Sequence, residues 1–275
     1  MKLLELVFSS LLLLTSITVF AKEAILIKDG NSSHSLSLQE IQSNKNIEEL
    51  KNIEIQAYPG KHFNLLTIKL CRLLNPADKN EEVKITAKDK YFIYLSRSDL
   101  SGCGKSSGVA PYLAIQKNKN MWPKMHKSHE EVGTFSLIWL GSSSENISKE
   151  KWVRNISTLE IVNRKGETEL IKSFHLKLNK NQDAGYRVFV DNCAGCHSLN
   201  LIGQLDIGPD LNYPMNPLEY FTKNVFKKFI RNPEAVRYFK NSKMEGFDMS
   251  AMSEEDLENL VSFMKLMIDH KIQRR

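Results

Sequence analysis

The feature that most constrains this 275-residue chain is a C-x-x-C-H stretch formed by Cys193, Ala194, Gly195, Cys196 and His197. Two thiols three positions apart, followed at once by an imidazole, suit three kinds of site. They can add to the two vinyl groups of one haem while the imidazole reaches the iron. They can also form a redox dithiol or supply half of a zinc site.

The residues around this motif favour haem attachment. A thioredoxin-like dithiol is expected after a strand, but the apolar positions from Tyr186 to Val190 predict the end of a short amphipathic helix. A zinc site needs more Cys or His nearby, and after the motif none follows before His270. The sequence therefore predicts one covalent haem c on Cys193 and Cys196, with His197 on the iron.

Short motifs around this stretch occur in the order of a known family. They are Gly185 and Phe189, Ile207-Gly208-Pro209-Asp210-Leu211, Phe229-Ile230-Arg231-Asn232-Pro233, Met244-Glu245-Gly246-Phe247 and Leu260-Val261-Ser262-Phe263-Met264. On these motifs, residues 181–275 resemble a class I cytochrome c domain, which implies an all-α fold. The resemblance also implies that Phe263 crosses the first helix near Gly185, where the missing side chain lets two backbones approach.

The same resemblance implies the axial ligands of the iron. His197 is the proximal ligand, held by a hydrogen bond between its other ring nitrogen and the Pro209 carbonyl. Met244 is the distal ligand. A thioether paired with an imidazole raises the potential and fills both axial positions, which is typical of electron transfer. Glu245 departs from the family, which usually has proline after the ligand.

Three other methionines compete with Met244 for the distal position, because any thioether near the pocket could ligate the iron. They are Met215, Met249 and Met252. For each of them, filling a gap in the core is the other interpretation.

The chain begins with a segment typical of export. Residues 1–21 carry Lys2, a mainly apolar run from Leu6 to Phe20 and a small residue, Ala21, at the exit. The run is short for a membrane span, so it predicts a signal peptide over residues 1–21. An uncleaved anchor, which would hold the protein at the membrane, is the alternative. Because the family resemblance implies haem attachment outside the cytoplasm, we expect a periplasmic protein.

Length and charge predict two domains after the signal, with a boundary between residues 180 and 181. Residues 22–180 hold 25 Lys and Arg against 18 Asp and Glu, whereas residues 181–275 hold 12 against 13. The basic half has no recognisable nucleic-acid module, so we expect no nucleic-acid partner. Its charge is interpreted as solubility or as steering towards an acidic redox partner or a membrane surface.

Residues 22–180 are predicted to form a strand-rich α+β domain. Segments rich in β-branched and aromatic residues predict strands at Ala24–Lys28, Ile53–Ala57, Val83–Thr86, Tyr91–Leu95, Thr134–Leu140 and Thr158–Val162. Apolar residues at helical spacing predict a helix from about His62 to Leu74, which Asn75-Pro76 ends.

Further short motifs are spread along this half. They are Asp29-Gly30, Ser37-Leu38, Leu70 to Leu74, Tyr91-Phe92-Ile93-Tyr94-Leu95, Ala110-Pro111-Tyr112-Leu113, Trp122-Pro123, Gly133-Thr134-Phe135-Ser136-Leu137-Ile138-Trp139 and Trp152 to Val162. Together they resemble the molybdopterin-binding domain of sulfite-oxidase-type oxidoreductases. That family binds its metal through one cysteine in a loop after a strand, and neither Cys71 nor Cys103 is placed there. Its exported members usually use a twin-arginine signal, which is missing here. We therefore expect a relative without the molybdenum cofactor.

Cys71 and Cys103 are the two cysteines that the haem does not use. In an oxidising compartment, a disulfide between them is the default, and we expect it. Free buried thiols are the alternative, because a bridge requires Cα atoms within about 7 Å.

One further cluster could suit a metal. Thioethers and imidazoles at Met121, Met125, His126 and His129 are the soft ligands that copper prefers. Lysines crowd the same stretch and oppose a cation, so we expect an exposed loop without metal.

These features predict a periplasmic c-type cytochrome that transfers single electrons through a His/Met-ligated haem, with an N-terminal domain that docks a partner protein. The first alternative is a haem-containing molybdenum oxidoreductase of the sulfite dehydrogenase type. The second is a haem-based sensor, which would need a labile sixth ligand. The sequence leaves the enzyme question, the redox partners and the oligomeric state open.

Overall fold

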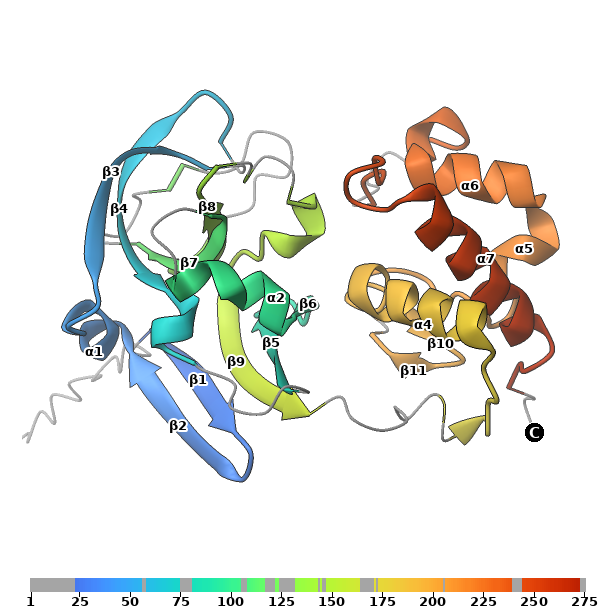
Figure 1. Ribbon diagram of the computed structural model, residues 1–275, viewed down its shortest axis with the longest axis horizontal. Coiled ribbons are helices and arrows are strands. Elements are labelled where there is room, and N and C mark those ends of the chain that lie inside the picture. The colour runs from blue at the N-terminus through green and yellow to red at the C-terminus, as the bar shows by residue number, and fades with distance from the viewer. Residues whose placement is uncertain are drawn as a thin grey trace, which may run out of the picture.

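The computed structural model consists of a strand-rich half followed by a helical half, which lie side by side (Figure 1). It describes residues 23–55, 58–74, 81–104, 108–116, 122–123, 132–142, 144, 147–163, 171, 173–204, 206–238 and 244–272. The predicted signal peptide and the Met121, Met125, His126 and His129 cluster lie outside the described residues. Within those ranges, no helix is both long and apolar enough to cross a bilayer.

The strand-rich half contains two sheets. The first has the order β2-β1-β9-β5-β6, in which β1 runs parallel to β9 and the other neighbours are antiparallel. Its strands are β1 (Ala24–Asp29), β2 (Ser32–Ser37), β5 (Glu81–Ala87), β6 (Phe92–Leu95) and β9 (Ile156–Asn163). The second sheet is antiparallel, in the order β3-β4-β7-β8. Its strands are β3 (Glu48–Glu54), β4 (His62–Lys69), β7 (Ala110–Ile115) and β8 (Phe135–Leu140).

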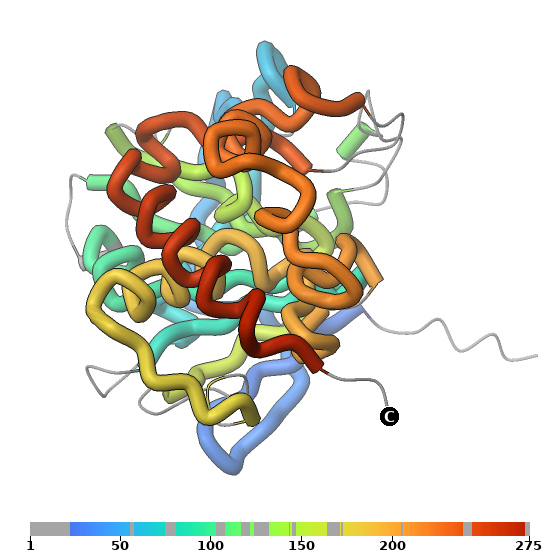
Figure 2. Tube along the Cα trace, turned by 90° about the vertical axis from the view of Figure 1, so that its right-hand side faces the viewer, coloured from blue at the N-terminus to red at the C-terminus, as the bar shows by residue number. Residues whose placement is uncertain are grey.

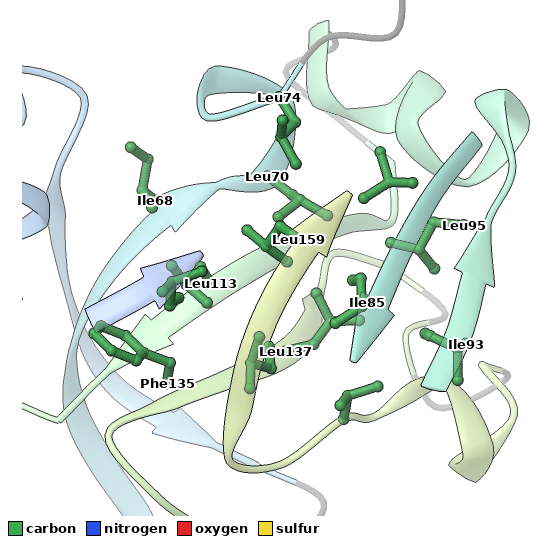
Figure 3. Close-up of a cluster of buried hydrophobic side chains, with 14 of the residues drawn as sticks. Ile68, Leu70, Leu74, Ile85, Ile93, Leu95, Leu113, Phe135, Leu137 and Leu159 are labelled. Atoms are coloured by element: carbon green, nitrogen blue, oxygen red, sulfur yellow. The ribbon is translucent and has the colours of Figure 1, made fainter. Parts of the chain in front are cut away.

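Both sheets contribute side chains to one apolar core (Figure 3). Along β5, Val83 and Ile85 are fully buried whereas Lys84 between them is not, as expected for a strand with one face on a core. Leu113 and Phe135 meet these residues from the second sheet. A second cluster, which includes Tyr58 and Trp122, covers the other face of that sheet. The strand-rich half is therefore held by apolar packing on both faces of its second sheet.

Short helices in this half begin at capping boxes. Ser37 caps α1 (Leu38–Gln42), and Ser96 caps α2 (Arg97–Leu100), each with a carboxylate three residues on. The 3-10 helices among the described residues of this half are η1 (Leu70–Arg72), η2 (Ser101–Gly104) and η4 (Lys149–Lys151).

Most of the predicted strands are confirmed, and one helix prediction is wrong. The strands predicted at 24–28, 83–86, 91–95, 134–140 and 158–162 are β1, β5, β6, β8 and β9, and the one predicted at 53–57 is displaced, since β3 ends at Glu54. The helix predicted at 62–74 is instead strand β4 followed by η1. Its leucines also suit a strand buried between two neighbours, and pairing with β3 and β7 overrides the helical spacing.

The helical half is built on two crossing helices, α4 (Lys180–Asn192) and α7 (Glu254–Ile268), which lie in front of the sheets in Figure 2. A Cβ atom on Gly185 would lie 1.9 Å from the Asn259 carbonyl oxygen and 2.9 Å from the Phe263 Cβ. This confirms the predicted crossing of Phe263 at Gly185. Tyr186, the residue after Gly185 in α4, packs on Phe263 of α7 with ring centroids 5.4 Å apart.

The part of this half that the structure describes also contains smaller elements. They are α5 (Pro217–Tyr220), α6 (Lys223–Arg231), η5 (Pro233–Ala235) and the antiparallel pair β10 (Ser198–Leu199) and β11 (Ile202–Gly203). The described residues of this half are thus mainly helical with a two-residue strand pair, a small departure from the expected all-α fold. Ile171 and Leu176, upstream of the predicted boundary, pack in its core.

Candidate functional site

The C-x-x-C-H motif begins at the C-terminal end of helix α4. Cys193 is the C-cap, and its N–H donates to the Phe189 carbonyl at 2.8 Å. The N–H groups of Cys196 and His197 both donate to the Cys193 carbonyl, at 3.0 and 2.9 Å. The motif is therefore one further helical turn, and residues three and four positions apart share a face of such a turn. This places both thiols and the imidazole where one planar macrocycle could bind all three.

His197 is fixed by the segment that follows it. Its Nδ1 is 2.7 Å from the Pro209 carbonyl oxygen, which confirms the predicted hydrogen bond. A carbonyl only accepts, so Nδ1 carries the proton and Nε2 keeps its lone pair for a metal. Burial lowers the pKa of His197, against the raising effects of this hydrogen bond and of Asp210, which favours the neutral ligating form. A Cβ atom on Gly208 would lie 2.5 Å from the His197 Cε1, so the ring needs a glycine there.

Asp210 organises the loop that supplies the Pro209 carbonyl. Its carboxylate accepts hydrogen bonds from the Ser198 hydroxyl at 2.8 Å and from the N–H groups of Leu201, Asn212 and Tyr213 at 2.6, 2.7 and 2.6 Å. Burial alone would raise the pKa of Asp210, but these donors outweigh it and hold the pKa below its ordinary value. The sequence placed Asp210 in a family motif but did not predict this role.

Three buried asparagines tie the same loop to the end of α7. They donate through their side-chain amides to carbonyl oxygens of its last turns and of the residues just after it: Asn216 to Met264 at 2.9 Å, Asn212 to Met267 at 2.7 Å and Asn200 to His270 at 2.6 Å. Asn212 also donates to the Asn200 Oδ1 at 2.9 Å, and its own Oδ1 accepts from Asn216 at 2.9 Å. The Met267 carbonyl also accepts from the His270 N–H at 3.0 Å, so the amides add side-chain bonds that tie the loop to this end of the helix.

Side chains cap helices in this half. Asn216 caps α5 and Asn232 caps η5, each followed by proline, and Ser253 caps α7 with Asp256 as its partner. They fix where the segments around the site enter their helices.

The four candidate methionines differ in their surroundings. Met244 is partly buried against the helical core, and Met252 is 2% exposed within it. Met215 and Met249 are 50% and 61% exposed. Met244 is therefore the candidate that combines a place at the core with partial access, whereas Met252 fits core filling.

Arg231, at the end of α6, holds the segment after Met244. Its Nη1 donates to the carbonyl oxygens of Phe247, Asp248 and Met252 at 3.1, 3.1 and 2.5 Å. The Phe247 N–H donates back to the Ile230 carbonyl at 3.0 Å. From the sequence, Arg231 is only one residue of a family motif, and its role could not be predicted. Its partners are backbone atoms, which no side-chain pattern reveals.

The cysteines divide into two pairs by environment. Cys193 and Cys196 are reduced, and burial raises the pKa of Cys193 to about 12, with the nearby Cys196, Glu150 and Asp191 adding to it. A redox dithiol needs a lowered thiol pKa, so this environment does not fit the thioredoxin-like alternative. Cys71 is disulfide-bonded, as predicted, and the side chain of its expected partner Cys103 lies outside the described residues.

These residues fit haem c. Two thiols and one imidazole lie on one turn, and Met244, Ile202 and Leu211 pack against the apolar core that contains Cys193. Thioether, imidazole and apolar surroundings are the donors and the setting that a haem requires.

Comparison with known proteins agrees with this geometry. The family model described as Cytochrome c matches residues 182–267, which supports a cytochrome c domain that binds haem c for electron transfer. A search of curated proteins finds no match to the chain. The resemblance of residues 22–165 to molybdopterin-binding domains stays a prediction.

Proposed function

We propose that this protein is a periplasmic c-type cytochrome that transfers single electrons through one His/Met-ligated haem, with its N-terminal domain docking a partner protein. The observation that carries the proposal is the C-x-x-C-H turn whose imidazole is locked by the Pro209 carbonyl. A bound haem would supply an iron that cycles between its ferrous and ferric states.

The roles of the residues follow from their chemistry. Cys193 and Cys196 would hold the haem through thioether bonds, and His197 and Met244 would supply the two ligands of its iron. The Pro209 carbonyl and the loop held by Asp210 keep the imidazole oriented, burial favours its neutral form, and Arg231 keeps the Met244 segment against the core. Because both axial positions are filled, electron transfer is favoured over substrate binding.

Location outside the cytoplasm rests on two features. The apolar run before Ala21 is typical of a signal peptide. The disulfide at Cys71 fits an oxidising compartment, since such bonds are rare where thiols are kept reduced. Both features agree with covalent haem attachment after export.

The N-terminal domain is proposed to bind a partner protein without a molybdenum cofactor of its own. The molybdenum alternative needs a cysteine thiolate as metal ligand, and the Cys71 sulfur is already in a disulfide. The predicted pairing with Cys103 would leave that site no thiolate. The basic charge of this half suits an acidic partner.

The test is an absorbance and metal analysis of the full chain purified from a periplasmic extract. We expect one iron per chain, a pyridine haemochrome spectrum of two thioether bonds, no molybdenum and a methionine-to-iron charge-transfer band. Met244→Ala should abolish that band, whereas Met249→Ala, at an exposed position, should keep it. Stoichiometric molybdenum, or carbon monoxide binding to the reduced wild-type protein, would contradict the proposal.

A further inference from the structure

The strand-rich half contacts the haem motif at the residue between its two thiols. A Cβ atom on Gly195 would lie 2.3 Å from the Phe92 carbonyl oxygen and 3.0 Å from the Tyr91 Cε2. Contacts this short leave no room for any side chain. The start of β6 therefore lies directly on the backbone of the C-x-x-C segment, and α4 contacts β6 in the same region (Figure 1).

Tyr91 connects this contact to a second element of the same half. Its hydroxyl donates to the Glu150 carbonyl in η4 at 2.6 Å, while its ring lies beside Gly195. Burial raises the pKa of the Tyr91 phenol well above its ordinary value, and the nearby Cys196 thiol and Glu150 carboxylate add to this. The phenol is thus a neutral, partly buried group packed between η4 and the haem motif.

Two ion pairs flank the contact. Lys149, also in η4, lies 3.0 Å from the carboxylate of Glu245, the residue after Met244. Lys90 pairs with Asp206, in the segment that leads to Pro209. Both pairs are largely exposed and contribute little free energy, but they show which segments face each other. The strand-rich half reaches the segment after the proximal ligand and the segment after the distal candidate.

We propose that the N-terminal domain covers the vinyl edge of the haem and excludes both water and an external redox protein from it. This rests on the proposed haem attachment, because thioether bonds to Cys193 and Cys196 fix the vinyl carbons beside Gly195. With His197 and Met244 as the two iron ligands, this edge would lie between their two segments. The surface formed by Tyr91, Phe92 and η4 contacts both of these segments. The partner that this surface binds is the haem motif of the same chain.

Zero-length carbodiimide crosslinking of the full-length holoprotein tests whether this surface is docked in solution. We expect amide bonds between Lys149 and Glu245 and between Lys90 and Asp206, mapped by mass spectrometry. The Lys88–Glu23 pair, 3.1 Å apart within the strand-rich half, is the internal control. Formation of the control crosslink with neither interdomain crosslink would overturn the proposal.

Gly195→Ala tests the consequence for the haem. The added methyl group cannot fit against the Phe92 carbonyl, so the interdomain crosslinks should fall while the Lys88–Glu23 crosslink stays. The rate of electron exchange with an inorganic complex at high ionic strength should rise several-fold, and the midpoint potential should fall as water reaches the edge. Tyr91→Ala should act in the same direction, and Tyr91→Phe, which keeps the ring, should have a smaller effect.

Two results would contradict the proposal that the N-terminal domain covers the haem edge. Crosslinks that persist at wild-type yield in Gly195→Ala would contradict the close packing, and lost crosslinks with an unchanged exchange rate and potential would contradict the role at the haem edge. A wild-type protein without haem would instead contradict the proposed function, which the pyridine haemochrome spectrum detects separately.

Discussion

The two halves of this protein bury different kinds of side chain. In the strand-rich half, the described buried polar residues are few and scattered: Ser37, Thr67 and Ser136. In the helical half they gather in one stretch after the haem motif: Ser198, Asn200, Gln204, Asn212 and Asn216. An apolar core stabilises a fold without fixing any one loop, whereas a hydrogen-bond network holds one loop in one conformation. The loop behind His197 is therefore held by directed polar bonds, and the strand-rich half by packing.

The largest expected effect tests the apolar half. Phe135 is 1% exposed between the two sheets, so Phe135→Ala should destabilise the strand-rich half by about 3–5 kcal/mol. Chemical unfolding followed by tryptophan fluorescence reports on this half, since all three tryptophans lie at 122, 139 and 152. Haem absorbance reports on the other half and should keep its midpoint. Tyr238→Ala, at a position 70% exposed, is the control. Equal shifts in both signals would show that the two halves unfold as one unit.

The next effect concerns the polar network. Asn212→Ala removes two donated bonds and one accepted bond at a fully buried position, which should cost about 2–3 kcal/mol. The haem absorbance transition should move and the tryptophan transition should not. Asn224→Ala, on the exposed side of α6, should leave both unchanged. A wild-type haem transition in Asn212→Ala would show that the network adds no stability.

A smaller effect is expected at Asp210. Asp210→Asn keeps the shape but replaces a charged acceptor by a neutral one, and should cost about 1–2 kcal/mol near neutral pH. The pKa of Asp210 is lowered by folding, so its contribution is complete above the pKa of the unfolded chain and is lost as pH falls through the lower folded value. The stability difference between wild type and Asp210→Asn should therefore shrink in acid. A difference that grows as the pH falls would contradict this account.

The smallest effect is expected where the halves meet. Lys90→Ala removes an ion pair whose side chains are 71% and 58% exposed, so the free energy of unfolding should change by less than about 0.5 kcal/mol. Denaturant titration at low and high salt measures it. A larger, salt-sensitive loss would show that charge rather than backbone packing holds the halves together.

Features encoded in short stretches could be predicted from the sequence. The haem motif, the caps at Asn216 and Ser253, and the Gly185 crossing each depend on a few neighbouring residues or on a family motif. The strand at 62–69 was mistaken for a helix because its leucines fit both periods, and only its pairing with distant strands decides.

The roles of other residues depend on contacts between distant segments. Asp210 also binds Ser198 and Leu201 in an earlier segment, and Arg231 binds backbone carbonyls between Phe247 and Met252. The three asparagines act on the end of α7 or just beyond it, about fifty or more residues further on. The contact between Phe92 and Gly195 joins two domains. None of these partners leaves a local pattern, so spacing and composition could not reveal them.

The asparagine bonds to the last turns of α7 also impose an order on biogenesis. During export the haem motif would reach the outside before α7, and the loop behind His197 cannot complete its hydrogen bonds until that helix arrives. Cys193 is only 8% exposed once the helical half has closed. The Cys193 thiol would therefore be open to haem attachment before closure, and packing of the C-terminal helix would end this period.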